Sequence, residues 1–484
     1  MKQVVFVGLI GLLAGICLAE RADLSLYFTY LLLAVTLCLI VIAFVDRSVF
    51  SMYFRVTLLF LCGCLLGLIR TNYSYSTLPE PILDSSLGIK QTIVAKVVTS
   101  VDTRDSSISF NVQPIIKGND GTLENIPLVR ITSDRLTDVM YGDVVHIQGV
   151  TQSVLTNSKT YKRLSDAYVR KGVLYEMRFP EVMILERGEG NFFKENTIAL
   201  NHWIKETITL YIREPSAGFI NGILIGEKHG LSKEWYDAFT RVGLTHIIVL
   251  SGYNLTIIFA WTKIALRRTS FIVQNSFGAL SVIALVFVSG AEAPAVRAGV
   301  LVLIVAMASL LRRQQDAGYF LSITVIVMLL INPFYFLYDV SFQLSIAATY
   351  GLVYIGPVLQ KYMTHFPRIV GDVVRDTSSA QLAVLPLQLF YFGTFSWIAI
   401  FVNVIVLPCI PVLMILGVLI LGTSFISSVA YFIGACTGLL SGIVLTFIKN
   451  VSSAISPSAV SINFFTLILC YVILIILIIK YKKV

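Results

Sequence analysis

Residues 243–258 read GLTHIIVLSGYNLTII, and they place a histidine, a serine–glycine pair and an asparagine inside a run apolar enough to enter a lipid bilayer. Each polar group taken into hydrocarbon costs free energy unless a partner satisfies it. His246, Ser251 and Asn254 therefore mark either contacts between packed helices or a path for a polar substrate. The remainder of the chain bears on which interpretation is better.

The composition indicates a polytopic membrane protein. Of the 484 residues, 56% are hydrophobic and only 13% are charged, whereas about a quarter of the residues in a soluble domain are charged. The net charge of +9 could suggest a nucleic-acid binder. However, most basic residues lie in short links or ends beside apolar runs, which is the positive-inside pattern and reports orientation. These basic positions are Arg47, Arg55, Arg267, Arg268, Arg312, Arg313, the link 361–375, Lys480, Lys482 and Lys483.

Apolar runs of suitable length predict about twelve helical spans. They cover residues 3–19, 26–45, 52–69, 245–265, 271–290, 295–311, 318–335, 340–358, 378–393, 397–421, 428–447 and 462–480. With Lys2 in the cytoplasm, this number puts both termini and every basic link in the cytoplasm of a multi-pass cell-membrane protein. Pro386, Pro408 and Pro411 could instead break two of these spans into re-entrant segments.

Residues 71–192 have a different, more polar composition. The short alternating segments QTIVAKVV, SISFNVQPII, NIPLVRIT and YGDVVHIQGV are separated by turn signals, and they predict a small all-β barrel or sandwich. The span count places this domain outside the cytoplasm. Its acidic and basic residues nearly balance, so it lacks the strong basic patch of a nucleic-acid binder. Its tyrosines could stack on bases, although packing in or around the barrel is the better interpretation. These tyrosines are Tyr141, Tyr161, Tyr168 and Tyr175.

Residues 193–213 carry apolar side chains at near-helical spacing among charges. The pattern predicts an amphipathic helix at the membrane surface or over the membrane core, with a connecting helix that buries one face as the alternative. A short apolar segment and a helix capped by Ser232 follow. The apolar positions of the first helix are Phe193, Ile198, Trp203, Ile204, Ile208 and Ile212. The predicted domains are N-terminal spans (1–70), the β domain (71–192), amphipathic and short helices (193–242) and a polytopic domain (243–484).

Several predicted spans carry groups that lipid does not tolerate. Arg297 cannot lose its proton, so it must face a protein partner, water or an anion. It could contact a substrate, snorkel outward, or pair with Glu292, which precedes the same helix near the positive end of its dipole. Asp339 begins a later span, Gln343 lies inside it, and Asn403 lies in another span. Such residues commonly join helices, but here they are numerous enough to line a hydrated passage.

Several catalytic motifs are missing from the sequence. It has no G-x-x-x-x-G-K-[ST] motif, so we expect no P-loop motor, and its five histidines are too far apart for the usual metal-hydrolase sets. The seven cysteines lie in apolar segments and argue against a disulfide framework or zinc site, and we expect no cofactor. His246 and Ser251 could act as base and nucleophile in an intramembrane hydrolase. Their spacing sets them about 140° apart on a regular helix, so this pairing needs a break, for example at Gly252.

Residues 222–258, GILIGEKHGLSKEWYDAFTRVGLTHIIVLSGYNLTII, resemble the core signature of the ComEC/Rec2 family of competence proteins. Those proteins are similar in carrying a glycine–glutamate turn, a short helix, then Gly-Leu-x-His and Ser-Gly-x-His/Asn entering a span. Further matches follow in the same order. They are Arg297-Ala298 with the Leu311-Arg312-Arg313 end, DVSFQLS from Asp339 to Ser345, QLAVLPLQLFYFGTFS and NVIVLPCIPV. The β region resembles the family's OB-like domain.

The resemblance implies a channel, not an enzyme, that passes single-stranded DNA through the cytoplasmic membrane during natural transformation. A cytoplasmic helicase-like ATPase and an external DNA receptor are the implied partners. We hypothesise that polar residues at membrane depth line the path, since a backbone phosphate needs donors and cations along its way. Those at family motif positions are His246, Ser251, Gly252, Asn254, Arg297 and Gln343, and the other candidates are Glu292, Asp339 and Asn403.

The sequence departs from the family pattern in two places. Many relatives continue into a metallo-β-lactamase-like domain thought to degrade the other strand, whereas this sequence ends at YKKV, so we expect a separate nuclease or none. The segment before AYVRKGVLYEM lacks the family's Asn-Pro-Gly-Gly-Phe-Asp run. Two other functions stay open: a channel or exporter for another polar polymer or solute, and the intramembrane hydrolase.

Overall fold

The structure is a computed structural model, and the chain divides into two compact units. We call Met1–Phe6, Leu200–Met328 and Val340–Val484 the membrane unit, and Val7–Ala199 with Leu329–Asp339 the barrel unit. The predicted span 26–45 falls outside the described residues, apart from residue 36. The described residues are 2–19, 36, 52–77, 87–103, 107–115, 117–118, 121–122, 127–135, 137–154, 172–188, 190–227, 230–248, 250–291, 293–310, 317–363, 365, 367–454 and 458–482.

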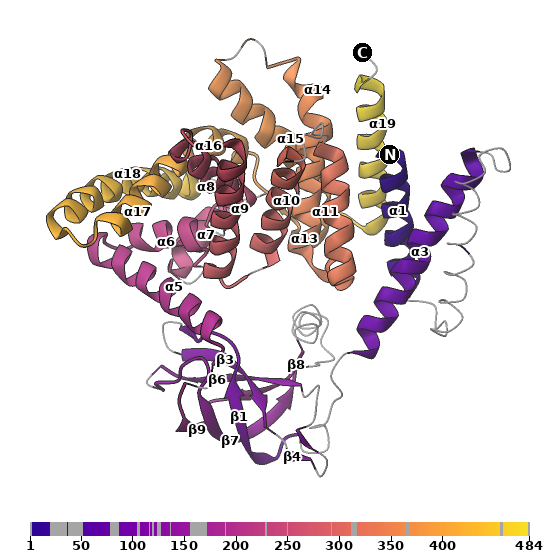
Figure 1. The fold of residues 1–484 in the computed structure, drawn as a ribbon. Helices are drawn as coiled ribbons and strands as arrows, with labels where there is room; N and C mark the ends of the chain where they lie inside the picture. The colour runs from indigo at the N-terminus through magenta and orange to yellow at the C-terminus, as the bar shows by residue number, and fades with distance from the viewer. Residues whose placement is uncertain are drawn as a thin grey trace. The chain divides into compact units, whose positions relative to one another are not determined.

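Five strands of the barrel unit close on themselves, which confirms the predicted small β barrel (Figure 1). The strands pair in the order β1-β3-β6-β8-β7, and β7 pairs back with β1. The β6–β8 pair is parallel and the other barrel pairs are antiparallel. The strands are β1 (Lys90–Val97), β3 (Ser107–Pro114), β6 (Leu128–Asp134), β7 (Val144–Ser153) and β8 (Val173–Arg178), with β2 (Asp102–Thr103), β4 (Lys117–Gly118), β5 (Gly121–Thr122) and β9 (Glu181–Glu186) beside them.

Alternate side chains of these strands point inward and form the barrel core, as the period-2 pattern predicts. Tyr175 is completely buried in that core, so it packs and does not offer a ring to nucleic-acid bases. Tyr141 contacts the segment between the barrel and α5 (Phe192–Tyr211). Its hydroxyl accepts a hydrogen bond from the backbone N–H of Asn191 at 3.3 Å. Tyr161 and Tyr168 lie outside the described residues.

Glycines allow two N-terminal helices, α1 (Lys2–Ala19, shared by the two units) and α3 (Met52–Ser76, in the barrel unit), to touch along their backbones. A Cβ atom at Gly15 would lie 1.9 Å from the Cys64 carbonyl oxygen, and one at Gly63 would lie 2.3 Å from the Gly8 carbonyl oxygen. Small residues spaced four apart are the usual device for such close contact between membrane helices.

The membrane unit is helical, with most of its helices at the predicted positions. They are α5 (Phe192–Tyr211, shared with the barrel unit), α6 (Ser216–Ile225), α7 (Lys233–Val242), α8 (Gly252–Ala265), α9 (Phe271–Val288), α10 (Ala293–Leu310), α11 (Ala317–Ile331, shared), α13 (Val340–Tyr350), α14 (Gly356–Gln360), α15 (Arg368–Phe392), α16 (Ala399–Val406), α17 (Cys409–Thr423), α18 (Ser427–Ala454) and α19 (Phe464–Lys482). The short helix α12 (Phe334–Tyr338) belongs to the barrel unit.

Fewer helices satisfy the requirements for a span than the sequence predicts. Among the described residues, five helices are long and apolar enough to cross a membrane, or six if the bent pair α16–α17 is one span. The predicted number of about twelve is therefore not confirmed. The qualifying helices are Val56–Ser76, Phe271–Val288, Val340–Gln360, Ser427–Ala454 and Phe464–Tyr481.

Proline and turn residues explain where predicted spans are shorter or broken. The predicted span 397–421 divides into α16 and α17, which differ in direction by 42°, because Pro408 at the junction has no N–H for the helical ladder. The predicted span 245–265 becomes helical only at Gly252. Pro386, in contrast, lies inside the continuous helix α15.

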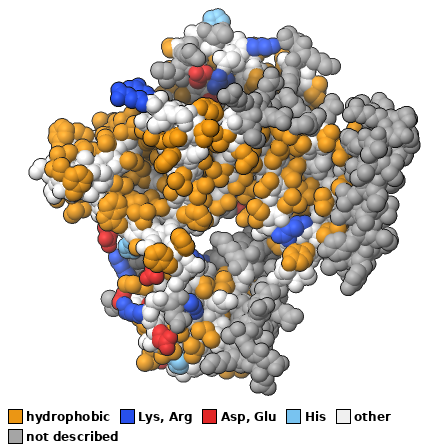
Figure 2. All heavy atoms as spheres, viewed as in Figure 1, with side chains coloured by type: hydrophobic (Ala, Val, Ile, Leu, Met, Phe, Trp, Pro, Cys, Tyr) orange, Lys and Arg blue, Asp and Glu red, His pale blue; other side chains and the backbone are white. Residues whose placement is uncertain are grey.

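Helix α6 forms the centre of the largest apolar core. All ten of its residues are buried, and the core around it includes Leu244, Val402, Leu413 and Ile448. Ten helical residues rise only about 15 Å, half the hydrocarbon thickness, so α6 cannot span a bilayer alone. The face that α17 and α18 present in Figure 2 is covered largely by hydrophobic side chains.

Candidate functional site

The first candidate segment lies in the connection between α7 and α8. Ser232 occupies the N-cap position of α7, although its side chain makes no capping hydrogen bond. Helix α7 ends at Gly243, whose φ of 79° is in the left-handed region. A Cβ at Gly243 would also lie only 2.8 Å from the Cβ of Ala399. Glycine is therefore required both for the turn and for the close approach to α16.

Ser251 and Asn254 organise the start of α8. Ser251 is the N-cap residue. Its Oγ accepts a hydrogen bond from the backbone N–H of Asn254 at 3.4 Å and donates to the side-chain Oδ1 of Asn254 at 3.2 Å. Asn254 is only 1% exposed, and its Nδ2 donates to the Ile223 carbonyl at 3.0 Å. That carbonyl belongs to the last turn of α6, where no further helical N–H is available. Asn254 thus joins α8 to α6, whereas Ser251 bonds only within the start of α8. The place of both residues on a DNA path stays a prediction.

His246 has an exposed side chain in the α7–α8 connection. Among the hydrogen bonds of the described residues, none joins His246 to Ser251, whose hydroxyl hydrogen is directed to Asn254 instead. The arrangement therefore lacks the base–nucleophile contact that an intramembrane hydrolase would use.

Arg297 connects α10 to the beginning of α13. The side chain is 7% exposed, and its Nη2 donates to the Ser341 carbonyl at 3.0 Å and to the Ser341 hydroxyl at 3.4 Å. The guanidinium carbon lies 5.6 Å from the centre of the Phe342 ring. A fixed positive charge is thus held beside the first turn of a helix, the end where a helix dipole also favours anions.

The structure brings two of the sequence motifs into contact. A Cβ at Gly252 would lie 3.3 Å from the Cβ of Ala298, the residue after Arg297. Leu250 and Leu255 share a small apolar core with Ala295, on the same helix as Arg297. The SG motif at the start of α8 therefore packs against the RA motif of α10.

Gln343 joins α13 to α15. The Tyr391 hydroxyl donates to Gln343 Oε1 at 2.7 Å. Both residues lie in segments that match the family pattern, DVSFQLS and QLAVLPLQLFYFGTFS. Tyr391 was missed by sequence reasoning because a tyrosine in an aromatic, apolar run carries no signal of a polar partner.

Among the described residues of the membrane unit, three buried oxygen atoms have no hydrogen-bond partner: Asn403 Oδ1, Asn221 Oδ1 and Ser396 Oγ. Asn403 is one turn beyond Ala399 on α16, so it lies on the side of α16 that meets Gly243. Asn221 lies in α6 and is 2% exposed. It was not predicted, although an amide within an otherwise apolar ten-residue helix was the available signal.

The remaining candidates are less well placed by the structure. Asp339 lies at the end of α12, immediately before α13, and belongs to the barrel unit. Glu292 lies outside the described residues. Among the residues that the structure describes, no three His, Cys, Asp or Glu side chains gather in a way that could hold a metal ion.

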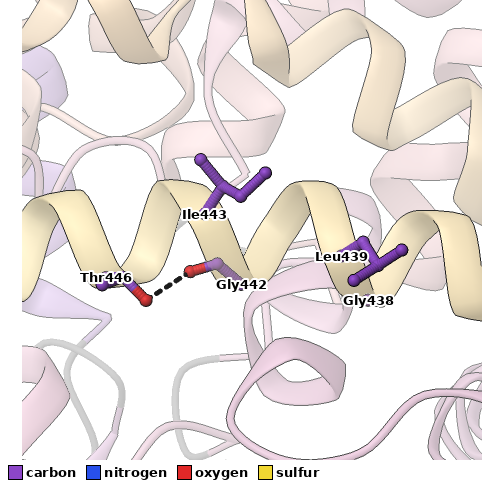
Figure 3. Close-up of a pocket in the computed structure, with 5 residues that line it drawn as sticks. All are labelled: Gly438, Leu439, Gly442, Ile443 and Thr446. Carbon is purple, nitrogen blue, oxygen red and sulfur yellow. Dashed lines mark hydrogen bonds between the residues drawn. The ribbon is translucent and has the colours of Figure 1, made fainter.

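A groove of about 420 Å³ runs along one side of α18 (Figure 3). None of the candidate polar residues described above lines it. Its lining consists of Gly438, Leu439, Gly442, Ile443 and Thr446, and the Thr446 hydroxyl is bonded to the Gly442 carbonyl of the same helix. It offers no free polar group for recognising a substrate.

Comparison with known proteins identifies the family. The family model described as "Competence protein" matches residues 223–483, more than half of the chain. The chain belongs to the competence protein family. This confirms the ComEC/Rec2 resemblance, and the matched region contains the α7–α8 connection, Arg297, Gln343 and Asn403.

A curated relative supports this membership. This chain is similar to ComE operon protein 3 of Bacillus subtilis (strain 168), with 26% identity over 239 residues, which are 48% of this chain and 30% of that protein. The matched part thus spans less than a third of the relative's length. No solved structure matches.

Proposed function

We propose that this competence protein passes single-stranded DNA into the cytoplasm during natural transformation. The family match over residues 223–483 carries the proposal, and the membrane-type helices support it. The protein acts as a channel without catalysing a reaction itself. A helicase-like ATPase in the cytoplasm supplies energy, an external receptor delivers DNA, and a separate nuclease removes the other strand where one is needed.

The proposed path follows the polar residues that α8, α10, α13 and α16 bring to membrane depth. Arg297 supplies the cation that a backbone phosphate favours, and its position beside the first turn of α13 adds the positive end of a helix dipole. Asn403 supplies a buried amide whose oxygen has no hydrogen-bond partner in the part of the chain that the structure describes. Broken helices such as α16–α17 are tolerated in a membrane where they line a hydrated cavity.

The proposed architecture is a membrane domain of about twelve spans with both termini in the cytoplasm. The barrel is an OB-like domain on the outer side. Support for the OB-like assignment comes from its five strands, which close with one parallel pair, because OB folds are small five-stranded barrels that commonly bind oligonucleotides.

The test is import of labelled duplex DNA into a nuclease-protected cytoplasmic fraction. A deletion strain is complemented with wild type, Arg297→Lys or Arg297→Met, and with Arg241→Ala as a control that removes an exposed arginine on α7. At equal protein abundance, we expect Arg297→Met to lower import about tenfold, which corresponds to about 1.4 kcal/mol of lost interaction. Arg297→Lys keeps the charge and should lose less.

Two results would count against the proposal. Unchanged import in the deletion strain, when wild-type cells import DNA, would remove the DNA-uptake function and favour another polar cargo. Normal import by an abundant Arg297→Met protein would leave the uptake function but remove Arg297 from the path.

A further inference from the structure

Helix α5 has an apolar stripe that the protein leaves uncovered. Sequence spacing groups its apolar residues on one face, but the structure separates them into two. Ile204 and Ile208 are buried against the membrane unit. The uncovered stripe consists of Phe192, Phe193, Leu200, Trp203 and Leu210, whose side chains are 44% to 80% exposed.

The stripe follows helical geometry. Phe192, Trp203 and Leu210 are separated by 11 and 7 residues, so they recur within about 20° of one another on a regular helix, and Phe193 and Leu200 lie about 80° to 100° further round. The basic residues of the helix point elsewhere. Lys194 lies 4.8 Å from the centre of the Tyr141 ring, and Lys205 pairs with Glu227 at 3.5 Å. Helix α5 therefore has a buried face, a charged face and an exposed apolar face.

Helix α5 is too polar to be a span. Its 20 residues include Lys194, Glu195, Lys205 and Glu206, and it is not among the helices that satisfy the requirements for crossing a membrane. A helix with Trp, Phe and Leu on one side and charges on another is typical of the membrane interface, where its apolar side enters the boundary between headgroups and acyl chains.

The exposed stripe continues onto a helix that does qualify as a span. Tyr211, next to Leu210, packs edge-on against Tyr431 of α18 at 4.9 Å. Gly434 allows this approach, since a Cβ there would lie 2.5 Å from the Tyr211 carbonyl oxygen. Beyond the contact, Phe432 of α18 is itself 71% exposed. The apolar surface is thus continuous from α5 to a surface expected to face lipid.

We propose that α5 lies in the membrane interface and inserts this stripe between lipid headgroups and acyl chains. The occupant is a lipid surface, because the stripe contains a tryptophan and two phenylalanines and joins the apolar surface of a candidate span. Aromatic side chains are enriched at this level of the bilayer. The proposal concerns the seating of the protein in the membrane and holds whether or not DNA is the cargo.

The test measures the surroundings of Trp203 by fluorescence quenching. The full chain, with Trp235, Trp261 and Trp397 replaced by phenylalanine, is reconstituted into phosphatidylcholine–phosphatidylglycerol vesicles. Some vesicles contain lipid brominated near the headgroup end of the acyl chain, and others contain lipid brominated near the chain terminus. We expect the shallow bromines to remove most of the Trp203 emission, the deep bromines to remove less, and aqueous iodide to remove little.

The matched control places the only tryptophan at Met183, which is 66% exposed on the barrel. Its emission should be quenched by iodide and not by either brominated lipid. For Trp203, quenching by iodide alone would show a stripe in water, and no quenching by any agent would show a stripe covered by protein. Either result overturns the proposal.

A second variant tests the stripe without altering Trp203. Phe192→Ser combined with Phe193→Ser should shift Trp203 emission to longer wavelength and weaken its quenching by the shallow bromines. Thr209→Ser, which changes an exposed position on α5 outside the stripe, should change neither. An unshifted spectrum and unchanged lipid quenching in the double variant, with normal helical content by circular dichroism, would contradict a role for the stripe in membrane seating.

Discussion

Asn254 tests whether a polar residue in the apolar core holds helices together. In Asn254→Ala the Ile223 carbonyl loses its side-chain donor. Leaving a buried acceptor without its partner costs about 1 to 3 kcal/mol. We therefore expect a lower thermal midpoint for the purified protein in detergent. Thr256→Ala is the control on the same helix, because Thr256 is exposed and bonds only to the Gly252 carbonyl within its own helix.

The same variant also separates the packing and path interpretations of Asn254. A normal thermal midpoint combined with weaker DNA import would contradict the packing prediction and move Asn254 to the proposed path. A lower midpoint with import that scales with the amount of folded protein would leave Asn254 as a contact between α6 and α8.

The Tyr391–Gln343 hydrogen bond permits a double-mutant cycle. Tyr391→Phe and Gln343→Leu each remove one partner of a 2.7 Å bond, and the double variant removes both. Interhelical hydrogen bonds in membrane proteins average about 0.6 kcal/mol in such cycles. We expect a coupling energy of this size from unfolding in detergent. Additive single effects would show that the bond contributes nothing to the packing of α13 on α15.

The types of the important residues could be read from the sequence, but their partners could not. Polar residues in apolar runs are visible without a structure, which is why Ser251, Asn254 and Arg297 were candidates. The contact between Arg297 and Ser341 could not be predicted in this way, because Arg297 donates to the backbone carbonyl of Ser341 as well as to its hydroxyl, and every residue has a backbone carbonyl. Distant contacts of this kind depend on how helices pack, and one sequence has no local pattern that reports them.

At the scale of elements, the contact between α1 and α3 depends on bare glycine backbone. Gly15→Ala would place a methyl group 1.9 Å from the Cys64 carbonyl oxygen, so the helices must separate. Overpacking of this kind costs about 1 to 3 kcal/mol. We expect a lower thermal midpoint and less protein in the membrane. Gly8→Ala is the matched control on α1, because its Cβ would meet no atom of the described residues within 4 Å, and equal effects of both variants would contradict the packing explanation.

The local sequence patterns predicted which segments form strands and helices better than they predicted where each helix begins. Alternating strands and apolar helices were found because each pattern records which side is buried. The start of α8 was placed too early, at residue 245 instead of Gly252, because the residues before Ser251 are as apolar as those of a span. They are apolar since they pack against α6 and α16, which only the tertiary structure shows.

For the whole molecule, the number of membrane crossings between the barrel and the basic link 361–375 decides the orientation. The sequence predicts five spans between them, which places the two on opposite sides of the membrane. Among the described residues of that interval, only Phe271–Val288 and Val340–Gln360 are long and apolar enough by themselves, and two crossings would return the chain to the same side. Shorter helices cross a bilayer only where it thins or where neighbouring helices cover their ends.

Cysteine labelling distinguishes these two arrangements. In a chain with its native cysteines replaced by serine, Met183→Cys lies on the exposed barrel surface and Tyr362→Cys lies exposed after α14. We expect a membrane-impermeant maleimide to label Met183→Cys in intact cells, and to label Tyr362→Cys only after permeabilisation. Labelling of both in intact cells would mean an even number of crossings, so that some of α8, α10 and α11 do not cross. Arg297 is on α10, so the membrane-depth argument for placing it on a DNA path would be lost if α10 were the helix that does not cross.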